Sequence, residues 1–142
     1  MRARAVGSGE HGMITLWVLG LAIAVLFLGG VGLDFWRAIA VRRQVSVMAD
    51  AAATAGANGL DEPALRGGSL QLDEARVREL VATQLGEYPE AAKLRFESVS
   101  VVDGRVIVTL REDVHFSLLG IFMGGGHFTV QAQAIAQPRE IP

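Results

Sequence analysis

The sequence predicts an α+β protein: a long N-terminal helix, transmembrane and then amphipathic, followed by a small domain with one helix and an antiparallel sheet. Three observations predict this class. Residues 13–33 form an apolar run that contains no charged residue. A stripe of apolar and small residues continues at helical spacing to residue 57. The last third of the chain changes to the alternating pattern that is typical of β-strands.

The apolar run is long enough to cross a bilayer as a helix. A hydrocarbon layer of about 30 Å needs about 20 residues at about 1.5 Å each, and Met13–Leu33 supplies 21. Trp17 and Trp36 stand near its ends, where indole rings suit the headgroup layers. Core helices of globular proteins are rarely apolar on every side over such a length. We therefore expect residues 13–33 to be a retained transmembrane helix, with membrane lipid as a partner.

A cleaved signal peptide is the alternative interpretation of this run. Ala38, Ile39 and Ala40 resemble a small-x-small cleavage site. The apolar region of a signal peptide is usually about 7 to 15 residues long, however, and the site here follows the bulky, charged sequence DFWR. The sequence favours an anchor, whereas cleavage would produce a mature N-terminus at Val41.

Residues 34–57 are expected to continue the helix outside the membrane. The range contains no proline, and its one glycine, Gly56, stands at the end. Spacings of three and four residues predict one buried face, formed by Ala38, Val41, Val45, Met48 and Ala52. The other sides carry polar or charged residues: Arg37, Arg42, Arg43, Gln44 and Asp50. Asp50 is a further candidate residue for contacts with a neighbouring helix.

Residues 58–142 are expected to form a small α+β domain. Gly, Asn and Pro predict a loop over 58–69. Asp73 suits the N-cap of a helix that ends at Gly86 and has one apolar face: Val77, Leu80, Val81 and Leu85. A domain of this size buries a modest core, so it should pack on the long helix or on a partner.

Three strands are expected in the last third. Asp103-Gly104 suits a two-residue hairpin turn between residues 96–102 and 105–110. The resulting register pairs Val101 with Val106 and Val99 with Val108, which gathers valines on one face. Residues 128–137 also alternate and predict a third strand.

The segment Phe116–Gly126 joins the second and third strands and is unusually apolar. It is far too short to span a membrane. Since a small domain needs large apolar side chains, we expect it to fold over the sheet and complete the core. An exposed ridge that contacts a partner or the membrane through Leu119 and Phe122 is the alternative.

Composition and motifs exclude several classes of function. The chain has no cysteine, and its net charge of −2 offers no basic face for nucleic acid. His11, His115 and His127 lack the short spacing of metal ligands. The glycines near residue 30 follow no strand, so they do not form a dinucleotide loop. We therefore expect no catalytic residue, cofactor, metal or small-molecule substrate, and no enzyme activity.

Four residues near the predicted span are candidates for helix packing. Asp34 lies three residues before Arg37, so the two side chains can pair along the helix. Asp34 would then either end the span as an ordinary interfacial charge or contact another envelope helix. Gly20 and Ala24 form a small-xxx-small pair that would let a neighbouring helix approach.

Residues 9–61 contain two distinctive sequences, GLDFWR after the predicted anchor and MADAAATAGA a few turns later. With these sequences the region resembles the TadE/TadG-like pilus-assembly proteins of the bacterial tight-adherence (Flp pilus) system. It implies a pseudopilin-like structural subunit of the cell envelope, with a pilin-like fold and no catalysis. It also implies a cytoplasmic N-terminus over residues 1–12, an extracytoplasmic domain over 58–142, and two kinds of partner: other pilin-like subunits and the inner-membrane assembly platform.

The sequence departs from the pilin pattern at the processing site. A prepilin peptidase cuts after a glycine that is followed at the fifth residue by glutamate, and after Gly12 the fifth residue is Trp17. We therefore expect no processing there. The numbers of basic residues on the two sides of the span are nearly balanced and lean slightly toward a cytoplasmic C-terminus, so the outward topology follows from the resemblance alone. An anchored extracytoplasmic module that binds or senses a ligand is the alternative function.

Overall fold

The computed structural model describes residues 8–117, 120–121 and 124–138, and the structural statements below concern these residues. The element order is α1 (Ser8–Gly56), α2 (Glu62–Arg66), α3 (Glu74–Gly86), the 3₁₀ helix η1 (Pro89–Lys93), β1 (Leu94–Val102), β2 (Arg105–His115) and β3 (His127–Ala136). The three strands form one antiparallel sheet in the order β1-β2-β3. This confirms the predicted class: a long apolar helix followed by a small domain with a helix and an antiparallel sheet.

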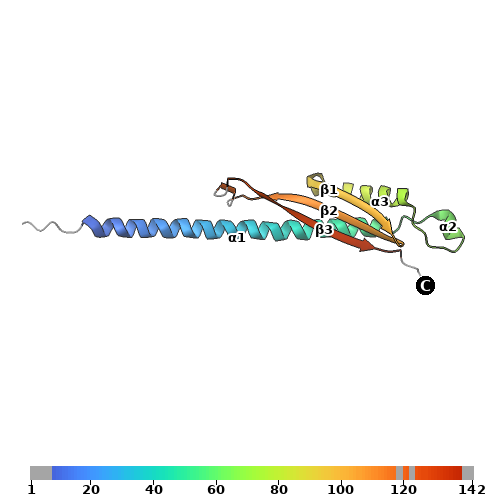
Figure 1. Ribbon diagram of the computed structural model, residues 1–142, viewed down its shortest axis with the longest axis horizontal. Helices are drawn as coiled ribbons and strands as arrows, with labels where there is room; N and C mark the ends of the chain where they lie inside the picture. The colour runs from blue at the N-terminus through green and yellow to red at the C-terminus, as the bar shows by residue number, and fades with distance from the viewer. Residues whose placement is uncertain (1–7, 118–119, 122–123, 139–142) are drawn as a thin grey trace, which may run out of the picture.

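One uninterrupted helix of 49 residues forms the axis of the molecule. Figure 1 shows the sheet and α3 lying along the C-terminal part of α1, while its N-terminal part projects alone. α1 packs on β2, β3 and α3, so its C-terminal part belongs to the domain. The sequence Ala38-Ile39-Ala40 lies inside this continuous helix.

The core of the domain lies between the outer part of α1, the helix α3 and one face of the sheet. The predicted stripe on α1 faces this core: Val45, Met48 and Ala52 are fully buried, and Val41 packs against them. Ala49 and Ala53 widen the buried face. The other members come from α3 and the sheet: Val77, Val81, Leu85, Val106, Val108, Leu110, Ala132 and Ala134.

Gly56, the last residue of α1, permits a close approach in this core. A Cβ added there would lie 3.0 Å from side-chain carbons of both Val106 and Val81. Gly59 approaches the backbone of α3 in the same way, with an added Cβ 2.9 Å from the amide nitrogen of Val77. Both glycines therefore permit a contact that larger residues would prevent.

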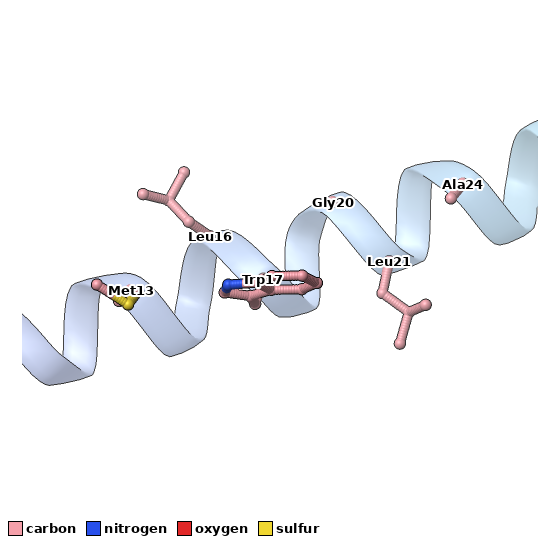
Figure 2. A pocket seen from close by; sticks show the side chains of 6 residues that line it. All are labelled: Met13, Leu16, Trp17, Gly20, Leu21 and Ala24. Carbon is pink, nitrogen blue, oxygen red and sulfur yellow. The ribbon is translucent and has the colours of Figure 1, made fainter.

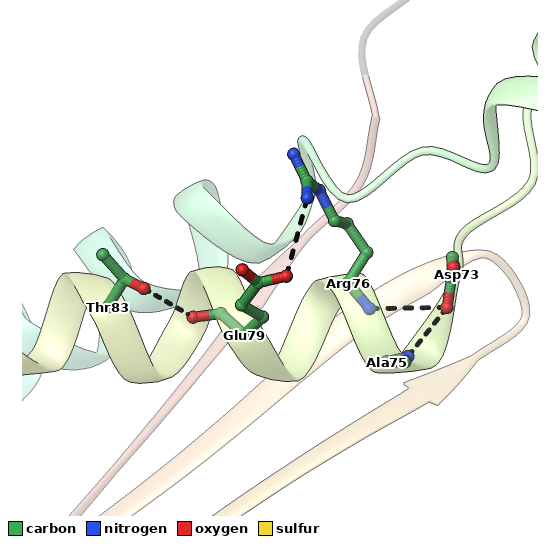
Figure 3. Close-up of polar contacts among 5 residues, drawn as sticks. All are labelled: Asp73, Ala75, Arg76, Glu79 and Thr83. Carbon is green, nitrogen blue, oxygen red and sulfur yellow. Dashed lines mark hydrogen bonds and ion pairs between the residues drawn. The ribbon is translucent and has the colours of Figure 1, made fainter.

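α3 begins where the sequence predicts. The Asp73 carboxylate accepts hydrogen bonds from the backbone N–H groups of Ala75 (2.8 Å) and Arg76 (3.4 Å), as Figure 3 shows. These bonds satisfy two of the donors that a helix N-terminus leaves unpaired. An exposed ion pair between Arg76 and Glu79 (3.5 Å) follows along the helix.

The β1–β2 hairpin has the predicted register. Val102 pairs with Arg105, Val101 with Val106 and Val99 with Val108. Asp103 and Gly104 both adopt positive φ (51° and 71°), the conformation that a tight hairpin turn requires.

Five details differ from the sequence prediction. The region 58–69 contains the helix α2, which Asp61 caps through a hydrogen bond from Ala64, instead of being entirely loop. The helix η1 was not predicted. β2 extends to His115, five residues further than expected, and β1 starts two residues earlier, at Leu94. β3 runs from His127 to Ala136, one residue ahead of the predicted range at each end.

Candidate functional site

The N-terminal part of α1 exposes apolar side chains on every side. Leu16, Trp17, Leu21 and Leu26 are each at least 65% exposed. Only 6% of the most apolar stretch of this helix is buried, so this stretch does not lie in the core of the domain. Within the described residues, α1 is the one helix long and apolar enough to cross a membrane, and it is a candidate single span.

The small residues of this span form a shallow groove. Gly20 and Ala24 line it together with Met13, Leu16, Trp17 and Leu21, as Figure 2 shows. A Cβ added at Gly20 would meet no atom within 4 Å, so the groove is open. Its shape suits the close approach of another helix.

Asp34 and Arg37 both contact Ser117, which lies just after β2. The backbone N–H of Ser117 donates to Asp34 Oδ1 (3.1 Å), and Arg37 Nη1 donates to Ser117 Oγ (2.7 Å). Asp34 is buried, with 6% of its surface exposed. The two charged residues thus connect the end of the apolar run to the β2–β3 connection of the same chain.

Apolar rings pack beside this polar contact. Phe116 and Phe128 lie 5.5 Å apart between ring centroids and line a shallow cleft with residues of α1: Val31, Asp34, Phe35 and Ala38. The backbone N–H of Phe116 donates to Gly126 O (3.0 Å), which closes the base of the connection. Here the domain meets the last turns of the apolar run.

The expectation that the Phe116–Gly126 segment completes the core does not hold for its described residues. Phe116 is half-buried, whereas Ile121 is 75% exposed. Gly124 and Gly125 adopt positive φ (72° and 92°) and turn the chain back toward β3. The candidate residues Leu119 and Phe122 lie outside the described residues.

The outer part of α1 also has an exposed side. Trp36, Ile39 and Val47 are between 51% and 71% exposed, although they lie beside or beyond the end of the predicted span. The candidate residue Asp50 is exposed on this part of the helix. An exposed apolar strip beyond the predicted span is a feature of surfaces that contact other proteins.

Two neighbouring carboxyl groups on β2 have opposite environments. Burial raises the pKa of Glu112, which points toward the core; Lys93 acts against this shift and Glu90 adds to it. The hydrogen bond from Thr129 Oγ1 (2.7 Å) lowers the pKa of Asp113, and Arg95 Nε (2.8 Å) acts in the same direction.

Glu112→Gln should therefore change the pH dependence of stability. Because burial raises the pKa of Glu112, the folded protein binds the carboxyl proton more tightly than the unfolded chain does. The free energy of unfolding therefore falls as the pH rises above the ordinary pKa of glutamate. We expect the free energy of unfolding of Glu112→Gln, relative to the unmodified protein, to increase from pH 4 to pH 7. Urea unfolding in detergent measures this difference, and an equal difference at both pH values would contradict the assignment.

The histidines come closer together than the sequence suggests. His115 and His127 pair across β2 and β3, with ring centroids 5.8 Å apart. Two imidazoles alone are too few ligands for a structural zinc site. In the part of the chain that the structure describes, no group of three or more His, Cys, Asp or Glu residues could hold a metal ion.

The sequence does not reveal two of the residues in this region. Ser117 contacts a residue 83 positions earlier in the chain, and Phe128 reaches α1 only through the fold of the sheet. In the register of β3 against β2, Phe128 lies opposite Val114, two residues before Phe116. A prediction of this register from the sequence would have placed Phe128 close to Phe116.

Comparison with known families gives a match in the N-terminal part of the chain. Residues 12–59 match the family model described as putative Flp pilus-assembly TadE/G-like, which confirms the predicted resemblance over this part of the chain. The match covers the candidate span and the outer part of α1 and ends before α2. Comparisons with curated proteins and with solved structures gave no match.

Proposed function

We propose that this chain, whose residues 12–59 match the TadE/G-like family of Flp pilus assembly, is a membrane-anchored, pseudopilin-like structural subunit. It would serve the assembly of a tight-adherence (Flp, type IV-like) pilus or a related secretion system. The observation that carries the proposal is α1: one unbroken helix is both the candidate span and the centre of the domain core.

This construction suits a mechanical role. A separate anchor on a flexible linker would leave the domain free to rotate, whereas here any displacement of the span moves the core with it. The buried residues Val45, Met48 and Ala52 attach the sheet to α1, the helix whose N-terminal part is apolar and exposed. A rigid rod with a lateral domain can be packed beside similar rods through its exposed surfaces.

The expected partners follow from the exposed surfaces of α1. The groove at Gly20 and Ala24 suits a second transmembrane helix, either of another pilin-like subunit or of the inner-membrane assembly platform. Ile39 and Val47, which lie beyond the predicted span, suit contacts outside the bilayer. The role is non-enzymatic, and the protein acts through packing.

Deletion of the gene tests the proposal. We expect the deletion strain to lose surface pili, counted by electron microscopy, and a plasmid copy of the full chain to restore them. A plasmid copy with Leu16→Ala and Leu21→Ala lacks two large side chains that line the groove. This double variant should restore fewer pili than the unmodified chain at an equal protein level. Normal pilus numbers in the deletion strain would contradict the proposal. Such a result, together with a lost response to an external compound, would favour a ligand-sensing module instead.

The proposed topology places the N-terminus in the cytoplasm and the domain outside. Because the chain has no cysteine, single cysteines report sidedness without background. Arg66→Cys, at an 80% exposed side chain of α2, should react with a membrane-impermeant maleimide in intact spheroplasts. Ser8→Cys should react only after lysis. The reverse pattern would contradict the outward topology.

A further inference from the structure

The two edges of the sheet differ in how they are protected. In the described part of the chain, β1 and β3 are the edge strands. β1 carries the charged residues Arg95 and Glu97, and its pairing with β2 is irregular between Leu94 and Phe96. β3 has no Lys, Arg, Asp, Glu or Pro in its ten residues and pairs with β2 in one continuous register. Charges and bulges hinder the pairing of an edge strand with another chain, so β1 has this protection and β3 lacks it.

The outer edge of β3 offers a row of backbone hydrogen-bonding groups. In an antiparallel pair, alternate residues bond to the neighbouring strand and the residues between them direct their N–H and C=O groups away from it. The N–H of Phe116 donates to Gly126 O (3.0 Å), so in the continuous register the even-numbered residues of β3 bond to β2. Five odd-numbered residues therefore direct their backbone groups outward: His127, Thr129, Gln131, Gln133 and Ile135. Within the described residues, no other strand pairs with this edge.

A groove follows β3 on the side away from β2. Its described lining comes from α1 and β3 alone: Phe35, Ala38, Ile39 and Arg42 of the helix, and residues 128–131 of the strand. The four helix residues recur at spacings of three and four, so they share one side of α1, which runs along β3 in Figure 1. Phe35 is 68% exposed and Ile39 is 51% exposed. A strand added to β3 would place alternate side chains over this side of the helix.

We propose that the outer edge of β3 binds an extended segment of a different protein, which adds a fourth strand to the sheet. Binding of this kind takes its affinity from main-chain hydrogen bonds and its specificity from alternate side chains. The inward side chains of the segment are apolar over Phe35 and Ile39, and one of them is an acid that reaches Arg42. Among the described residues that line the groove, Arg42 alone is charged. The inference concerns the domain and holds whether or not α1 spans a membrane.

A second copy of this chain fits the edge poorly. Its β3 contains no acidic residue that could pair with Arg42. Its β1 is the charged and irregular edge strand. The occupant is therefore a strand that this chain does not itself supply.

Photo-crosslinking in the native strain tests this contact, with a photoreactive residue in place of Gln133. Gln131→Pro removes an N–H that points to the free edge and leaves the bonds between β2 and β3 in place. Gln131→Thr is the matched control, because it keeps this N–H and loses the same hydrogen bond from Arg111. We expect one adduct in which the crosslinked segment of the partner has alternate apolar residues and an Asp or Glu. Its yield should fall at least 5-fold with Gln131→Pro and change little with Gln131→Thr.

A second pair of variants tests the charge in the groove independently of the strand backbone. Arg42→Glu should lower the yield of the adduct, whereas Arg43→Glu, at an exposed residue that does not line the groove, should not. Equal yields from these two variants overturn the inference, as does an adduct formed with a second copy of this chain or no adduct at all. An adduct that persists with Gln131→Pro also overturns it. Pilus number in the deletion strain is a separate measurement, so the proposed function can fail or hold independently of these results.

Discussion

Met48→Asp should unfold the domain, while Val47→Asp on the same helix should leave it folded. Met48 is fully buried at the centre of the core, and Val47 is 53% exposed. Truncation of a buried methionine costs about 2 to 5 kcal/mol, and a carboxylate without a partner adds a desolvation cost of several kcal/mol more. Small domains are stable by about 5 to 15 kcal/mol, so the sum removes most or all of the stability.

Limited trypsin digestion of the detergent-purified protein measures this loss. Arg95, Arg105 and Arg111 lie on the strands, where the folded sheet protects the backbone from cleavage. Cleavage in this region should accelerate at least 10-fold for Met48→Asp and change little for Val47→Asp, because proteolysis follows the population of the open state. Equal resistance of the two variants would mean that α1 does not form the core of the domain.

Ile23→Arg combined with Leu26→Arg should release the protein from the membrane. Both side chains project from the bare part of α1, near the middle of residues 13–33. An arginine at the centre of a span costs about 2.5 to 3.5 kcal/mol for insertion, so two cost about 5 to 7 kcal/mol. Val47→Arg places the same charge on an exposed part of α1 beyond the predicted span and should have no such effect.

Alkaline carbonate extraction of pulse-labelled cells measures the release. The unmodified chain and Val47→Arg should remain in the membrane pellet, and most of the double-arginine variant should appear in the supernatant. Full retention of the double variant in the pellet would contradict the anchor. Sequencing the N-terminus of the purified protein adds an independent check, since a start at Val41 would identify a removed signal peptide.

The sequence was sufficient to predict the elements whose signals are local. The stripe from Val41 to Ala52 predicts the face of α1 that packs in the core, because helical spacing alone determines which side chains share a face. Asp73 predicts the start of α3 through its capping bonds. Asp103-Gly104 predicts the hairpin register, because a two-residue turn leaves one pairing for the flanking strands.

The elements that were missed depend on contacts across the fold. The predicted second strand ends at Leu110, before the charged residues Arg111, Glu112 and Asp113, whereas β2 continues to His115 and Glu112 occupies an inward position of the strand. Neither α2 nor η1 has more than five residues, and helices this short are stable only in a tertiary setting.

The candidate interaction residues also include some whose surroundings follow from local spacing and others whose contacts depend on the fold. Gly20 and Ala24 share a groove, as their spacing of four predicts. The shared partner of Asp34 and Arg37 is Ser117, 80 or more positions away, and only the folded sheet places it there.

Photo-crosslinking from the groove in the native membrane tests the structural role most directly. A photoreactive residue in place of Leu16 lines the groove of the span, and the same residue in place of Arg66 serves as a control far from it. The proposed function predicts that position 16 yields adducts that mass spectrometry identifies as pilin-like subunits or the inner-membrane assembly platform, and that position 66 yields fewer. Recovery of only the uncrosslinked monomer from position 16, in cells that are assembling pili, would contradict it.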